Sequence, residues 1–147
     1  MGRPKAHIVN KRYEILTSDQ KTKFLDAFYI IRNSVQWKPG KDISHLEKRK
    51  RMRHLALTAS LRDYHDVIST LVRNDQNIVY LYEFENTYYY AVRGFFQGNE
   101  WLVIFGNDGI IETAFPPEDI DHYLTNRGFV LLDRISEVLK WTKLVKN

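Results

Sequence analysis

The chain has 147 residues, of which 44% are hydrophobic and 27% charged, with a formal net charge of +4 and no cysteine. This balance predicts one folded domain, and the missing cysteines exclude disulfides, thiolate catalysis and cysteine zinc sites. The basic first residues lack an apolar h-region, and no apolar run reaches the ~20 residues that span a bilayer. We therefore expect neither a signal peptide nor a membrane partner.

Helices are predicted in the first half of the chain. Thr17 is a suitable N-cap for a helix whose apolar residues continue to Val35, and Ser60 is one for a helix with a strong apolar stripe. Between them, a helix with few apolar positions is expected at residues 42–57. A short strand or arm is expected before these helices, at residues 7–16.

Strands are predicted next, at residues 78–84, 87–95, 100–105 and 110–115. The short polar turns between them imply an antiparallel meander, and alternation places Tyr90 and Arg93 on opposite faces. The remaining expected elements are a short helix ended by Gly128, an edge strand or loop at residues 129–132, and a helix at residues 136–144.

This order predicts an α+β fold with N-terminal helices packed on one face of a four-stranded antiparallel meander sheet, followed by a short C-terminal helical addition. The other face is expected to be free to carry a site. We expect a single domain over residues 1–147, with a core at 43–117, an N-terminal arm and helix at 1–42, and a C-terminal helical extension at 118–147.

The charge is concentrated near one short run. Eight cations and only two acids lie between Lys38 and Arg62. Such a cluster predicts a surface that binds polyanions such as nucleic acid, although runs of this kind are often no more than a solvated helix face. The candidate nucleic-acid-binding residues are Lys48, Arg49, Lys50, Arg51 and Arg53.

Three residues are candidates for chemistry. His54 ends the basic run and is a candidate general acid or base, although a lone histidine is more often structural. Arg93 is a cation inside a strand, where it needs an anion, a carboxylate or solvent. Thr113 is a candidate hydroxyl donor to a phosphate, predicted to share a face with Ile111, although threonine is common in strands.

The other histidines are interpreted as follows. His65 is expected to be a surface residue, and the remaining three belong to no constellation; they are His7, His45 and His122. No histidine spacing is typical of a metal site, so we expect no metal and no cofactor.

The order of elements, with the segments "LVRNDQNI" and "EWLVIFGNDGIIETAFPP", resembles the barnase–EndoU–colicin–RelE (BECR) nuclease superfamily, especially its phage- and toxin-associated members. The resemblance covers roughly residues 43–117 and implies helices packed on a four-stranded antiparallel sheet. Members typically cleave RNA without metal. By position, His54 matches the histidine after the basic helix, Thr113 matches the hydroxyl residue of the last strand, and Arg93 supplies a mid-sheet cation.

The resemblance implies a metal-independent, toxin-like endoribonuclease in which the substrate's 2′-OH attacks the phosphate to give a 2′,3′-cyclic phosphate. Expected partners are RNA (tRNA or mRNA) and a cognate antitoxin or immunity protein. The expected location is the cytoplasm, reached directly or by delivery into a target cell as part of a larger toxin. The alternatives are a non-catalytic RNA- or DNA-binding module that uses the basic helix and exposed tyrosines, and a protein–protein module.

Overall fold

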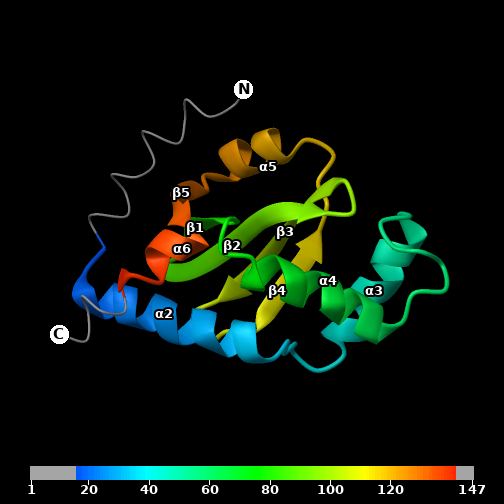
Figure 1. Cartoon of the computed structure of the whole chain (residues 1–147), viewed down its shortest axis with the longest axis horizontal. Coiled ribbons are helices and arrows are strands. Elements are labelled where there is room, and N and C mark those ends of the chain that lie inside the picture. Colours follow the sequence, from blue (N-terminus) through cyan, green and yellow to red (C-terminus); the bar gives the residue numbers. More distant parts are fainter. Residues whose placement is uncertain (1–15, 142–147) are drawn as a thin grey trace.

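The computed structural model in Figure 1 describes residues 16–141 and confirms the α+β class. Three helices come first, a sheet follows, and two short helices flank the last strand. The elements are α2 (Ser18–Asn33), α3 (Lys41–Arg51), α4 (Leu61–Arg73), β1 (Ile78–Phe84), β2 (Thr87–Phe96), β3 (Asn99–Gly106), β4 (Ile111–Phe115), α5 (Ile120–Arg127), β5 (Val130–Arg134) and α6 (Ile135–Val138). Within this part of the chain, no helix is long and apolar enough to cross a membrane.

The sheet has five strands in the order β4-β3-β2-β1-β5, and every neighbouring pair is antiparallel. The predicted meander is β1 to β4. The fifth strand resolves the alternative left open by the sequence, because β5 pairs with β1 at the edge opposite β4. Residues 7–15 of the predicted arm and residues 142–144 of the predicted C-terminal helix lie outside the described residues. Within the described residues, that helix is α6 and ends at Val138, earlier than predicted.

Two helices begin with the caps that the sequence predicts. Thr17 and Gln20 form a capping box at α2, and Ser60 and Asp63 form one at α4. The helix α3 ends earlier than predicted, at Arg51. Leu46 is its only buried apolar residue, so little packing supports a longer helix.

The sheet separates two hydrophobic cores, and Figure 1 shows it between α2 and α4 on one side and α5 on the other. Tyr90 and Val92 of β2 point into the first core with residues of α2, α4 and α6. Ala91 points into the second core with Ile120 and Leu124 of α5. The predicted alternation of β2 is therefore correct. The second face is not free, because α5 covers part of it.

The edge strand β4 carries a register shift. Ile111 pairs with Phe105 and packs in the first core, whereas Thr113 pairs with Ile104 of the second core. Glu112 is the extra residue of the bulge, which turns Thr113 away from the face of Ile111. The prediction that Ile111 and Thr113 share a face is therefore wrong.

Other parts of the chain hold this edge in place. The Gln36 carbonyl accepts a hydrogen bond from the Ile111 amide at 2.8 Å. The Tyr64 hydroxyl, buried in α4, donates to the Ala114 carbonyl at 2.6 Å. These contacts fix β4 relative to the helices, and α3 lies beside the same edge (Figure 1).

Candidate active site

Arg93 lies in the second core, held by acidic side chains. Its guanidinium donates to both carboxylate oxygens of Glu100, at 2.7 and 3.1 Å, and to Asp121 at 2.9 Å. It also donates to the Tyr80 hydroxyl at 3.2 Å. These partners raise its pKa despite burial. Two carboxylates neutralise this cation, so the geometry favours a structural role that ties β2 and β3 to α5.

Thr113 meets a histidine that the sequence does not single out. Its Oγ1 lies 3.3 Å from Nδ1 of His45, a hydrogen-bond distance in which either atom can donate, depending on the imidazole tautomer. His45 projects from α3 across the edge of β4. Its ring also stacks on Trp37, with centroids 5.3 Å apart. The only sequence signal for His45 is its position four residues before Arg49, because residues so spaced share a helix face.

His54 follows α3 in a turn and does not continue the helix. Arg53 has a φ of 61°, in the left-handed region, and the His54 amide donates to the Arg49 carbonyl at 2.8 Å. The expectation that the basic helix continues through His54 is therefore wrong. The turn folds the His54 ring back toward the helix, and Nη1 of Arg49 lies 3.1 Å from its Nδ1.

Arg49 is the unusual residue of this region. It is only 3% exposed, and its Nε is buried without a hydrogen-bond partner among the described residues. No carboxylate within residues 16–141 forms an ion pair with it. Its guanidinium instead lies over the ring of Phe115, 5.4 Å from the centroid. A buried cation without an anion is costly, so this arrangement indicates a place where a negative ligand would be stabilised.

The charge of Arg49 acts on the two histidines nearest to it. Burial lowers the pKa of His45, and the positive charges of Arg49, Lys41 and Lys48 lower it further. Burial and then Arg49 lower the pKa of His54. Both imidazoles are therefore mainly neutral at pH 7. A neutral imidazole with a free nitrogen can accept a proton, which is what a general base requires.

Aromatic residues support this group from the side of α4. The Trp37 indole donates to Nε2 of His65 at 3.1 Å. Burial lowers the pKa of His65, against the opposing effect of Asp42 and Asp66. His65 is thus a partner that fixes the Trp37 ring against His45. It is half-buried, so it lies at the surface as expected but also makes this contact.

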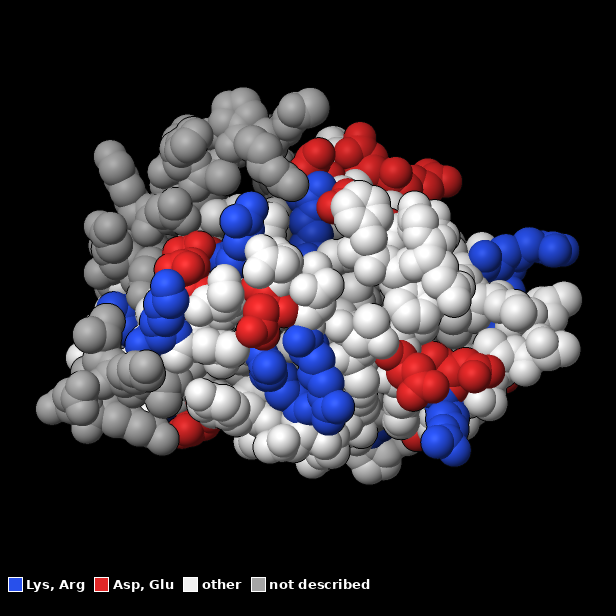
Figure 2. Space-filling view, in the orientation of Figure 1, with Lys and Arg blue, Asp and Glu red and all other residues white. Residues whose placement is uncertain are grey.

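The basic run does not form one surface. Arg49 is buried and Lys50 pairs with Glu47 at 3.6 Å, which leaves Lys48, Arg51 and Arg53 exposed. Figure 2 shows one face of the molecule, on which Lys and Arg side chains are dispersed among acidic ones. The alternative interpretation, a solvated helix face, therefore describes the exposed residues of the run.

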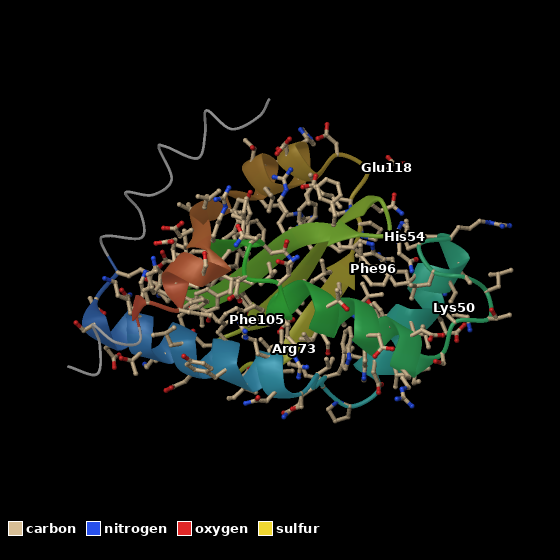
Figure 3. The ribbon with its side chains drawn as sticks, viewed as in Figure 1. Lys50, His54, Arg73, Phe96, Phe105 and Glu118 are labelled. Atoms are coloured by element: carbon tan, nitrogen blue, oxygen red, sulfur yellow. The ribbon has the colours of Figure 1, made fainter. Side chains whose placement is uncertain are left out.

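His54 and Thr113 do not touch each other. The His54 ring lies edge-on to Trp101, with centroids 6.5 Å apart, and Figure 3 shows it between the end of α3 and the strands, near Phe96. The residue of α3 that contacts Thr113 is His45. The structure thus holds two contacting pairs, His45 with Thr113 and Arg49 with His54. His45 and Arg49 are one turn apart on α3, and the charge of Arg49 lowers the pKa of His45, so the two pairs lie side by side at the β4 edge.

Comparison with protein-family models, with curated proteins and with solved structures gives no match for this chain. The resemblance to the nuclease superfamily therefore rests on the quoted residues and stays a prediction. In the part of the chain that the structure describes, no three His, Asp or Glu side chains come together as a possible metal site.

Proposed function

We propose that this chain is an endoribonuclease that cleaves RNA by attack of the 2′-OH, with its active site at His45, Arg49, His54 and Thr113. The observation that carries the proposal is the buried Arg49 guanidinium, which donates to His54 and forms no ion pair with a carboxylate among residues 16–141. A phosphodiester would supply the missing negative charge. This assignment moves the catalytic cation from Arg93 to Arg49.

His45 is the proposed general base. Its lowered pKa keeps it neutral, and its partial exposure lets it reach a substrate. It would take the proton of the 2′-OH while that oxygen attacks phosphorus. The bond from phosphorus to the 5′-oxygen then breaks, water supplies a proton to the leaving oxygen, and a 2′,3′-cyclic phosphate remains. General-base catalysis of this kind contributes about 10²–10⁴-fold.

Arg49 and His54 would act on the phosphate. Arginine stays protonated, so its donation to Nδ1 of His54 requires that nitrogen to be the acceptor. The ring then carries its proton on Nε2, which is available to a phosphate oxygen. Arg49 would contribute a fixed positive charge from beneath, where the low dielectric strengthens its effect on the transition state. Thr113 would orient His45.

Product chemistry tests this function. Purified protein is incubated with a single-stranded RNA in EDTA, and the new ends are identified. We expect 2′,3′-cyclic phosphate and 5′-hydroxyl ends, and no cleavage of the same strand with 2′-O-methyl riboses. Cleavage of the methylated strand, or 5′-phosphate products, would contradict attack by the 2′-OH.

The second candidate is a non-catalytic RNA-binding module. The observation that favours it is the burial of Arg49. Because this side chain is only 3% exposed, its direct contact with a phosphate is limited. A module of this kind would bind RNA with a salt-sensitive affinity and leave it intact. The same incubation, followed by recovery of uncut RNA from the complex, distinguishes it from the enzyme.

A further inference from the structure

A groove of about 250 Å³ crosses the second face of the sheet next to Thr113. Strands β1 to β4 all contribute to its floor, and α5 forms one wall. It is smaller than the ~300–1,000 Å³ of typical small-molecule sites, which suits one ring system better than a whole cofactor. Its aromatic and cationic lining comes from Tyr82, Phe84, Tyr89, Tyr123, Arg127 and Phe129, and we call it the aromatic groove.

Three rings of the aromatic groove are nearly parallel. The rings of Tyr82 and Phe129 stack with centroids 4.8 Å apart and planes 21° apart, and those of Tyr82 and Phe84 are 6.1 Å and 20° apart. Phe84 ends this series and is 50% exposed, a large value for a phenylalanine. Parallel rings with an open end are a surface on which a further planar ring can stack.

A cation lies on the wall of the groove. The guanidinium of Arg127 is 4.5 Å from the centroid of the Tyr123 ring. Arg127 is exposed, and in the described part of the chain it forms no ion pair. A planar guanidinium on an aromatic ring can bind a phosphate or stack on a base, so the groove combines the two kinds of contact that single-stranded nucleic acid uses.

The aromatic groove is continuous with the candidate active site. Thr113 lines the groove and also contacts His45 at 3.3 Å. A second connection runs through Phe115, whose ring meets Tyr123 at 5.1 Å and Arg49 at 5.4 Å. A nucleotide whose phosphate lies at Thr113, above the buried Arg49, therefore has the groove next to it.

We infer that the aromatic groove binds one unpaired base of a single-stranded RNA, next to the phosphate held at the active site. The inference rests on the proposed function for the identity of the ligand. A base in a duplex is stacked and paired, and it cannot enter the groove without being extruded. The substrate class is therefore single-stranded RNA or an unpaired loop.

Fluorescence of an uncleavable probe tests this inference. The probe is a single-stranded 2′-O-methyl RNA with one 2-aminopurine, whose emission falls when the base stacks. Wild-type protein should bind it and quench the emission. Phe84→Ala should weaken binding on the order of tenfold and restore emission, because loss of one base stack has about this effect. Arg127→Gln, at a second exposed position, should also weaken binding.

Phe95→Ala is the matched control, because Phe95 is 67% exposed and does not line the groove. It should leave binding and quenching unchanged, and the duplex form of the probe should bind at least tenfold more weakly. The inference is overturned if Phe84→Ala behaves as wild type, if Phe95→Ala causes the same loss, or if the duplex binds equally well. Because the probe is never cut, its binding does not depend on catalysis. If the wild-type protein bound the probe but did not cleave RNA, only the proposed function would be contradicted. If the protein cleaved RNA but Phe84→Ala left probe binding unchanged, only the base-binding role of the aromatic groove would be contradicted.

Discussion

Nη1 of Arg49 lies 3.1 Å from Nδ1 of His54, and in the part of the chain that the structure describes no carboxylate neutralises this guanidinium. Because the arginine must donate, His54 is held neutral with its proton on Nε2. A second buried arginine shows the contrasting arrangement, since Arg93 is enclosed by Glu100 and Asp121. One fold thus holds a compensated cation in its second core and an uncompensated one at the edge of its sheet.

The first prediction follows from this contrast. Arg49→Met should change the free energy of unfolding by less than about 1 kcal/mol, because replacing an uncompensated buried charge with an apolar chain of similar size is close to neutral. Arg93→Met should lower it by about 2 kcal/mol or more, because two carboxylates lose their partner. Urea denaturation of both variants measures the difference. Equal losses would show that Arg49 is a structural residue like Arg93.

The second prediction concerns stability and pH. The pKa values of His45, His54 and His65 are all lowered in the folded protein. Below the ordinary histidine pKa of about 6.5, the unfolded chain takes up protons that the folded chain does not. Stability should therefore be full above that pH and fall as the pH drops from 7.5 to 5.5, as measured by the midpoint of thermal unfolding.

Glutamine variants provide the control for this pH effect. His54→Gln and His65→Gln keep an acceptor for Arg49 and Trp37 but cannot titrate, so the double variant should show a flatter decline. His122→Gln, at an exposed position on α5, should decline as wild type does. A wild-type midpoint that rises on acidification would contradict the lowered pKa values.

The third prediction concerns the exposed part of the basic run. Replacing Lys48, Arg51 and Arg53 with alanine should reduce the slope of log K against log salt for RNA binding, by about 0.7 for each lost phosphate contact on a single strand. The control set replaces three exposed cations at the opposite end of the molecule, which are Lys23, Arg134 and Lys140. If both sets give the same slope as wild type, the run serves only as a solvated helix face.

The fourth prediction concerns Thr113. Thr113→Val keeps the β-branch and the volume but removes the hydroxyl that contacts His45. Folding should be preserved, and cleavage should fall on the order of tenfold because His45 loses its orienting partner. Far-UV circular dichroism and single-turnover cleavage measure the two effects. Wild-type cleavage by this variant would show that the Thr113 hydroxyl has no part in positioning His45.

The sequence predicts the regular elements well because their signals are local. Thr17 and Ser60 are capping residues within one turn of the groups that they satisfy, and the alternation of β2 reports its faces directly. The position at which α3 ends is not predicted correctly, because it depends on tertiary packing. Little such packing is present after Arg51 to extend the helix. The bulge at Glu112 depends on the register with β3, which no local pattern contains.

The candidate site is predicted only in part, because it depends on how α3 lies against the β4 edge. Arg49 was one of five similar cations, and nothing in the run distinguishes the one that becomes buried. His45 belongs to no sequence motif, and it becomes a candidate catalytic residue only through its contact with Thr113 in the structure. Arg93 is conspicuous in a strand, yet its carboxylate partners come from β3 and α5. Contacts between distant segments therefore decide which charged residues are free for chemistry.

The most direct test of the central claim is the single-turnover rate of RNA cleavage by His45→Ala, compared with His122→Ala as a matched histidine control. We predict that His45→Ala lowers the rate by about 10² or more while RNA affinity stays near that of wild type, and that His122→Ala retains the wild-type rate. A wild-type rate for His45→Ala, in a variant with an unchanged thermal midpoint, would contradict the assignment of the active site to the β4 edge.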